Sequence, residues 1–312
     1  MKRLQNRVSQ SRLLLPVVVL YAVAVWLLAG GIQQGWYVQL ACFTLSTYLM
    51  VEVNNAHALL RIYSRMVSSS FVVLMCCATF LFASAHEAVM LLFIIAAMHI
   101  ALYSYQDKQA VGIVYYSALC FGLASMAYVH VLCLLPLVWL FMAFSLQNLS
   151  WRTFGASLLG LLTPYWLAAC WLLWQGDLLV LTDHFASLVT TVCNPFDLSL
   201  LAPHQLAFYV FMAILVLTGT IHFLRQNYHD SIRIRMFYDM FIWTSWLMLL
   251  LIAVQPCHYG ALMHILIVAA SPLAAHFVAL TSTRATNVAF MVICGCALLL
   301  TAYSLWMSSF NS

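Results

Sequence analysis

The chain has 312 residues but only eight acidic side chains, so each carboxylate is a candidate for chemistry. Glu87 follows His86 at the start of an apolar run, and Asp183 precedes His184 in the longest segment between such runs. A carboxylate beside an imidazole can act as a general base or bind a divalent cation. We therefore expect Glu87 and Asp183 to be the catalytic candidates, with a divalent cation as the cofactor that they would take. The alternative is ordinary surface polarity, which loops need in any case.

A second polar group follows another apolar run and contains Asn54, Arg61 and Arg65. The two arginines are four residues apart, so in a helix they share a face, and Asn54 lies seven residues earlier on the same side. Arginine offers a planar fork that matches phosphate oxygens. We expect a short interfacial helix whose Asn54, Arg61 and Arg65 bind lipid phosphate. The alternative is simple anchoring, with Glu52 bonded to a neighbouring arginine.

A third group consists of Asp230, Arg233, Arg235 and Asp239. Arg235 and Asp239 are four residues apart at the start of an apolar run, which favours a salt bridge within one helix.

Histidine and cysteine are frequent, with eleven and ten residues, but their spacing does not match a metal site. HExxH, CxxC and CxxCH motifs do not occur, so a haem or zinc site is disfavoured and most histidines are expected to be polar packing residues. Cys193 and Cys257 are the two cysteines outside apolar runs, and they could form a disulfide if their side of the membrane is oxidising.

The composition fixes the environment of the chain. Hydrophobic residues make up 65% and charged residues 6%, whereas soluble domains have about 25% charged residues. A soluble fold and a disordered chain are therefore excluded. A net charge of +4 spread over 312 residues also excludes a nucleic-acid partner.

Apolar runs long enough for membrane helices recur along the whole chain, since about 20 residues are needed for each span. Eleven such runs are present: Leu13–Leu28, Trp36–Val53, Val67–Ala83, Ala88–Tyr103, Ala110–Met126, Val131–Leu146, Phe154–Trp174, Leu206–Leu224, Phe237–Val254, Tyr259–Leu280 and Asn287–Met307. They lack the two-residue alternation of a membrane barrel. We predict an all-α helix bundle that forms one transmembrane domain over residues 1–312.

The basic residues give the orientation. With eleven spans, all twelve Lys and Arg residues fall on one side, which predicts a cytoplasmic N-terminus. The long loop 175–205 is then outside, and its stretch Leu178–Val192 is apolar enough for an interfacial helix. We expect a multi-pass protein of the bacterial cytoplasmic membrane.

Two segments resemble a family of uncharacterised bacterial polytopic inner-membrane proteins. They are Glu52–Ser70 (EVNNAHALLRIYSRMVSSS) and Tyr116–Trp174, which has Gly-Leu-Ala, Leu-Pro, Trp-Arg and Gly-x-x-x-Pro-Tyr in order. The second segment is also similar, more distantly, to the middle helices of membrane glycosyltransferases of the GT-C type. That resemblance implies a lipid-linked sugar donor and a catalytic acid in the first outer loop. Here that loop is AGGIQQG, so Glu87 in the second outer loop would have to replace it.

Three functions are compatible with these features. The first is a GT-C-like transferase with Glu87 or Asp183 as its outer acid. The second is a non-catalytic envelope-assembly scaffold that binds membrane-protein partners through its apolar faces. The third is a transporter, which is disfavoured because the centres of the spans contain no carboxylate.

Overall fold

The computed structural model describes residues 4–190, 194–281 and 283–310. Every regular element in these residues is a helix, which confirms the all-α prediction. Six of the helices are long and apolar enough to cross a membrane. The chain is therefore a helical membrane protein.

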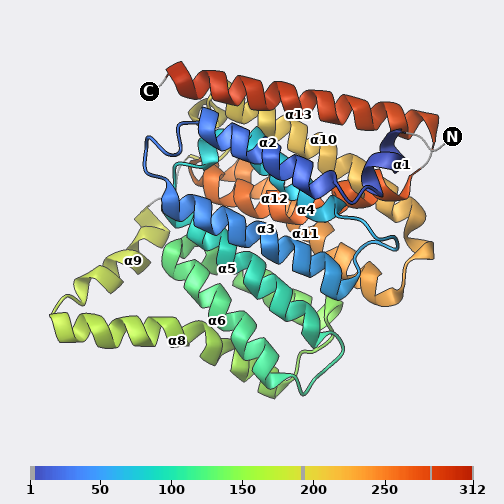
Figure 1. Cartoon of the computed structure of the whole chain (residues 1–312). Coiled ribbons are helices and arrows are strands. Elements are labelled where there is room, and N and C mark those ends of the chain that lie inside the picture. The colour runs from blue at the N-terminus through green and yellow to red at the C-terminus, as the bar shows by residue number, and fades with distance from the viewer. Residues whose placement is uncertain (1–3, 191–193, 282, 311–312) are drawn as a thin grey trace.

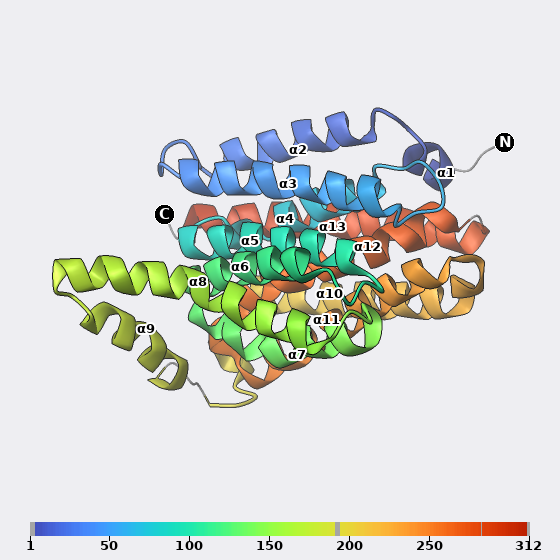
Figure 2. The ribbon, with the colours of Figure 1, turned by 90° about the horizontal axis from the view of Figure 1, so that it is seen from below.

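The long helices run back and forth through one bundle, and short helical turns join them (Figures 1 and 2). The α-helices are α1 (Leu4–Ser9), α2 (Leu14–Leu28), α3 (Tyr37–His57), α4 (Met66–Cys77), α5 (Ala85–Ala101), α6 (Val111–Ala127), α7 (Leu135–Leu140), α8 (Trp151–Gln175), α9 (Leu179–Thr190), α10 (Pro203–Gln226), α11 (Ile232–Val254), α12 (Tyr259–Leu280) and α13 (Arg284–Phe310). The short turns are η1 (Thr79–Leu81), η2 (Leu102–Ser104), η3 (Val129–Leu134), η4 (Phe141–Ser145), η5 (Leu198–Leu200), η6 (Asn227–His229) and η7 (Pro256–His258).

Each of the eleven apolar runs coincides with a helical segment, but the run Val131–Leu146 is broken into three pieces. It consists of the 3-10 turn η3, the six-residue α7 and the π-helical turn η4. Helix α6 ends before it, at the extended residue Tyr128. The chain then returns to the end where α6 began, because Gln106 N donates to Leu146 O at 2.7 Å. The stretch 110–146 is thus two antiparallel segments, as its length predicts.

Helix α12 is the centre of the bundle (Figure 1). Within its apolar stretch 94% of the residues are buried, and it packs against α4, α5, α10 and α11. A helix that is apolar on all sides is expected to be buried. Alanines such as Ala270 and Ala275 let the neighbouring helices approach closely, because small side chains allow tight packing between membrane helices.

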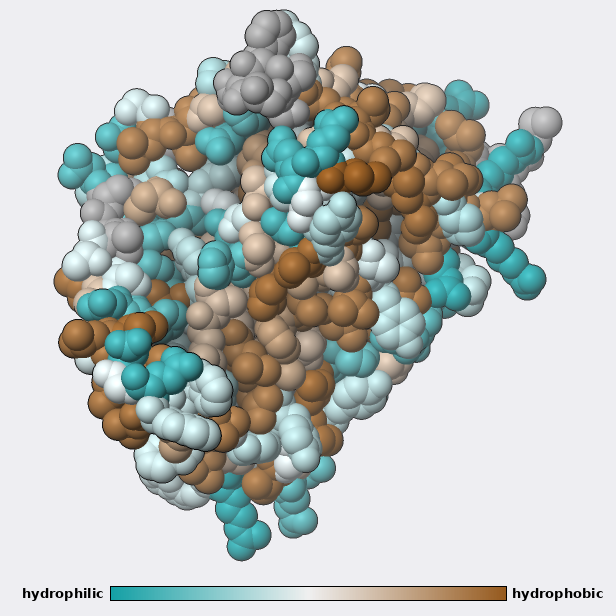
Figure 3. All heavy atoms as spheres, turned by 60° about the vertical axis from the view of Figure 1, so that its left-hand side comes forward, coloured by the Kyte–Doolittle hydropathy of each residue, from teal (hydrophilic) through white to brown (hydrophobic). Residues whose placement is uncertain are grey.

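The peripheral helices expose large apolar side chains on the flanks of the bundle. Leu20 of α2 and Leu299 of α13 are both 71% exposed, and Trp166 of α8 is equally open. Figure 3 shows broad apolar areas on the face that it presents, with polar side chains between them. Water would oppose so much exposed apolar surface, whereas lipid tails would solvate it.

Helices α8 and α9 form a hairpin that projects beyond one end of the bundle (Figures 1 and 2). Gly176, in the left-handed conformation, ends α8 after 25 residues and allows the turn. Helix α9 confirms that the apolar stretch Leu178–Val192 forms a helix over Leu179–Thr190. None of its residues is fully buried, so α9 covers the end of the bundle without entering it.

The opposite end of the bundle carries the basic residues of the described chain, and we call it the basic end. It includes α1, the α3–α4 and α10–α11 connections and the first residues of α8 and α13, all toward the right of Figure 1. We call the end with the first turn of α5 the Glu87 end.

Two glycines allow α6 and α8 to pack closely. A Cβ on Gly122 would lie 2.7 Å from the main-chain oxygen of Leu161, and one on Gly160 would collide with the main-chain oxygen of Tyr115. Gly155, five residues earlier on α8, has no such neighbour within 4 Å. Gly160 is therefore required by packing, and Gly155 is not.

Replacing Gly160 by Val should separate α6 from α8 and lower the stability by about 1–3 kcal/mol, as overpacking does. Thermal unfolding of the protein purified in a mild detergent measures the effect. Gly155→Val is the matched control and should unfold close to the wild-type temperature. Equal shifts for both variants would contradict this account of the α6–α8 contact.

Candidate functional site

Glu87 lies in the first turn of α5, where the helix N-terminus favours a negative charge. The Ser84 hydroxyl caps this helix by accepting from Glu87 N at 3.3 Å. The Glu87 side chain is 19% exposed, so it is partly shielded but still accessible. The preference of a helix N-terminus for a negative charge thus places the Glu87 carboxylate at one end of the bundle rather than in its interior.

The carboxylate of Glu87 rests against the start of α12. A Cβ on Gly260 would lie 2.5 and 2.6 Å from the two Glu87 oxygens, so a larger residue there would displace the carboxylate. His264 Nδ1 lies 3.5 Å from Glu87 Oε2 but only 2.8 Å from Gly260 O. The imidazole therefore donates to the main-chain carbonyl, and Glu87 is its close electrostatic neighbour.

A tyrosine and two further histidines lie at the same end. The hydroxyl of Tyr128 is 2.7 Å from His258 Nδ1, and the rings of His258 and His130 are 3.9 Å apart between centroids. Tyr128 also interacts electrostatically with Glu87. The break at the end of α6 presents Tyr128 and His130 together, because both lie within three residues of that helix end.

Helix α9 closes over this group from the side. Its His184 faces Tyr165 of α8 at 6.1 Å between ring centroids, and His130 interacts with both Ser187 and His184. Asp183, the residue before His184 on α9, is exposed. The structure thus brings Glu87 and His258 to one neighbourhood, whereas Asp183 is an exposed residue outside it. We define the Glu87 cluster as Glu87, Tyr128, His130, His184, His258 and His264.

The divalent cation that the sequence suggested has no cluster of protein ligands among the described residues. No group of three or more His, Cys, Asp or Glu side chains among them is arranged to hold a metal ion. Cys257 is exposed in η7, but Cys193 lies outside the described residues, so the predicted disulfide stays a prediction.

At the basic end, Asp230 is the centre of a buried ion network. Its carboxylate lies 2.9 Å from Arg61 Nε and 3.2 Å from His276 Nε2. Its side chain is 1% exposed, whereas that of Arg61 is 34% exposed. Arg235 Nε donates to the main-chain oxygen of Asp230 at 3.0 Å. Arg235, which the sequence predicted to pair with Asp239, therefore bonds to the main chain of Asp230.

The segment with Asn54, Arg61 and Arg65 differs from the expected interfacial helix. Helix α3 ends at His57, Ala58 is left-handed, and residues 58–65 form an irregular loop. The helical face shared by the two arginines is therefore absent. Asn54 Nδ2 donates to Ser64 O at 2.9 Å, and Arg65 lies over the Tyr63 ring. The α10–α11 connection supplies Asp230 to Arg61, so a long-range contact overrides the local pattern.

Sequence reasoning missed most of the Glu87 cluster. His130 and His264 look like ordinary packing histidines, and Tyr128 has no motif around it. One signal was available, because Tyr128 and His130 separate two apolar runs and must therefore lie at an end of the bundle. The contact between Glu87 and Gly260 joins residues far apart in sequence and leaves no local trace.

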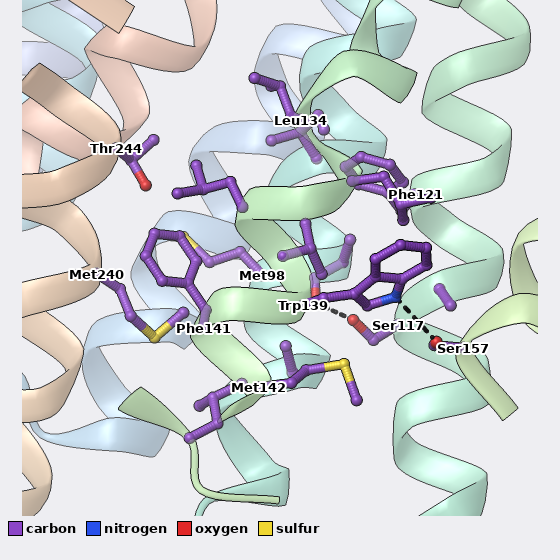
Figure 4. A pocket seen from close by; sticks show the side chains of 18 of the residues that line it. Met98, Ser117, Phe121, Leu134, Trp139, Phe141, Met142, Ser157, Met240 and Thr244 are labelled. Atoms are coloured by element: carbon purple, nitrogen blue, oxygen red, sulfur yellow. Dashed lines mark hydrogen bonds between the residues drawn. The ribbon is translucent and has the colours of Figure 1, made fainter. Parts of the chain in front are cut away.

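An apolar cavity of about 140 Å³ lies between α5, α6, α11 and α12 and is covered by α7 and η4 (Figure 4). Trp139 Nε1 donates to Ser157 Oγ at 3.2 Å, and Ser117 Oγ donates to Ala97 O at 2.8 Å. These two polar groups of the lining are thus already satisfied.

Removing the Asp230 carboxylate should destabilise the protein, because His276 is then buried without its partner. Asp230→Ala should cost about 2–3 kcal/mol, less than a fully buried pair would, since Arg61 can reach water. Thermal unfolding in detergent measures the loss. Asp177→Ala, at an exposed acid beyond α8, is the control and should unfold like the wild type. A similar unfolding temperature for Asp230→Ala and the wild type would contradict the structural role.

The geometry of the two ends is the basis for any functional assignment of this chain. Comparison with known proteins adds no relative: no family model, no curated protein and no solved structure matches it.

Proposed function

We propose that this protein is a GT-C-like transferase of the bacterial inner membrane that uses a lipid-linked sugar donor. The observation that supports this function best is the Glu87 cluster. It combines a partly accessible carboxylate, a tyrosine and several imidazoles at one end of an apolar bundle. General-base catalysis needs a carboxylate that can reach a substrate hydroxyl.

In the proposed reaction, Glu87 accepts the proton of the acceptor hydroxyl. That oxygen bonds to the anomeric carbon of the sugar while the bond from this carbon to the phosphate oxygen breaks. The electron pair leaves with the lipid phosphate. Imidazole N–H groups of His130 and His258 would donate hydrogen bonds to the departing phosphate, as charge-assisted bonds stabilise such oxygens.

The proposed topology has eleven spans, a cytoplasmic N-terminus and an outer C-terminus. Its support is the gathering of basic residues at one end, since short cytoplasmic loops are rich in Lys and Arg. The Glu87 end then faces the periplasm, where lipid-linked sugars are used.

The second candidate is a non-catalytic scaffold for envelope assembly. The projecting α8–α9 hairpin favours it, because Trp171 and Trp174 are exposed and could contact a membrane-protein partner. Tryptophan is also enriched at membrane interfaces, so the alternative role of this hairpin is to anchor the protein there.

Replacing Glu87 by Gln should abolish transfer, because the amide cannot accept the proton. In a host strain that lacks this protein, a polyprenyl-phosphate-linked sugar should accumulate and be detectable by mass spectrometry of lipid extracts. The wild-type chain should restore its consumption, and Glu87→Gln should not, at equal protein level.

Asp183→Asn is the matched control and should restore consumption, since Asp183 is exposed and does not belong to the cluster. Restored consumption by Glu87→Gln would contradict the role of Glu87. No change in any lipid-linked sugar on loss of the chain would exclude the transferase and leave the scaffold, which should co-purify with a stoichiometric partner.

The topology is tested by reporter fusions along the chain. A fluorescent-protein fusion after Lys108 should fluoresce, because this reporter folds only in the cytoplasm. An alkaline phosphatase fusion after Gly176 should be active, because this enzyme matures only outside. The reverse result at either position would contradict the eleven-span arrangement.

A further inference from the structure

The wall of the apolar cavity changes its helix type along its length. It is formed by η3, α7 and η4, which change from 3-10 to α to π geometry within 17 residues. No residue of α7 is buried, although the segment covers the cavity. π-helical turns occur often at functional sites. This wall is thus a loosely packed element beside an internal space.

The cavity has the size and lining of a hydrocarbon site. Its volume of about 140 Å³ is close to that of an engineered apolar cavity of about 150 Å³ that stays dry and binds benzene. It therefore has room for roughly six carbons of a longer chain. Figure 4 shows Phe141 on the side of Met240 and Thr244 of α11, and Trp139 toward α6 and α8.

The outer side of this wall is exposed on the flank of the bundle. Leu140 and Phe144 are 53% and 72% exposed, and Trp243 of α11 is 67% exposed. In a bilayer these residues contact lipid tails. A chain that enters between η4 and α11 thus comes directly from the surrounding lipid.

One end of the cavity is polar and lies at the basic end of the bundle. Asn148 lines it, is fully buried, and has an Oδ1 without a hydrogen-bond partner, while its Nδ2 donates to Ser104 Oγ at 2.6 Å. Two exposed cations lie nearby, Lys108 on the α5–α6 loop and Arg152 in the first turn of α8. Ser150, which caps α8, donates to Lys108 O at 3.1 Å. Basic pockets between membrane helices are suited to anionic lipid headgroups.

We infer that this cavity binds an anionic phospholipid, with one acyl chain between η4 and α11 and its phosphate near Lys108 and Arg152. A headgroup hydroxyl, as in phosphatidylglycerol, would donate to Asn148 Oδ1. The headgroup end of this site lies at the opposite end of the bundle from the Glu87 cluster, and the site does not depend on transfer. It also differs from the segment with Arg61, whose guanidinium is engaged by Asp230.

The test uses the full chain in nanodiscs with phosphatidylglycerol that carries a diazirine in the middle of one acyl chain. After illumination, mass spectrometry should find label on cavity residues such as Met98, Trp139 and Met142. The same diazirine in phosphatidylcholine should label them at least about tenfold less. Label confined to outer residues such as Leu20 and Leu299, or equal labelling by both lipids, would overturn the inference.

Two variants of α7 separate chain binding from general lipid contact. Val138→Trp fills the cavity and should reduce its labelling at least about tenfold, whereas Leu140→Trp adds the same bulk on the exposed face and should not. Lys108→Gln combined with Arg152→Gln should remove the preference for phosphatidylglycerol, and Arg12→Gln combined with Arg284→Gln should keep it. Undiminished cavity labelling in Val138→Trp at wild-type thermal stability would overturn the inference, and Glu87→Gln should label like the wild type.

Discussion

Close packing around α12 is the constraint on which the rest of the structure depends. Lipid tails are as apolar as leucine, so helices in a bilayer are held together by contact and hydrogen bonds rather than by exclusion from water. Small residues along α12 allow the neighbouring helices to pack closely against it. Because α12 is buried along its length, any polar side chain on it must be satisfied inside the protein. His264, near one end, donates to Gly260 O, and His276, near the other end, pairs with Asp230. The two histidines are about 18 Å apart along the helix axis.

The two polar centres have opposite characters. Asp230, with Arg61 and His276, is closed and joins the α3–α4 loop to α12 across the basic end. The Glu87 cluster is partly open, and its members come from α5, α9, α12, η7 and the break after α6. A closed ion network fixes the arrangement of chain segments, whereas the proposed general base, Glu87, lies in a group that is partly exposed. The structure thus places the ion network and the Glu87 cluster at opposite ends of the bundle.

Much of the fold follows from local pattern. Apolar length predicts each helical segment, and the stretch 110–146 is too long for one span, so its reversal near Tyr128 could be predicted. The same local rules failed at residues 58–65, where Asp230 from the α10–α11 connection binds Arg61. They also failed at Arg235, which donates to the main-chain oxygen of Asp230 five residues earlier. The candidate functional site also combines features that local sequence predicts with features that it does not. Glu87 and its helix start are local features, whereas its contact with Gly260 and the outward position of Asp183 depend on how α5, α9 and α12 meet.

The π turn η4 has a consequence for how the basic end is coupled to the interior. Leu146 N donates to Phe141 O five residues back, so the carbonyl of Met142 is released, and it accepts from Asn148 N at 3.0 Å and Leu149 N at 3.2 Å. An ordinary α-helical turn would claim that carbonyl for Leu146 and rotate the following residues by about 100°. Asn148 would then leave Ser104. The hydrogen-bond register of this turn therefore links a residue of the inner wall, Met142, with the loop that carries Lys108 and the start of α8 that carries Arg152.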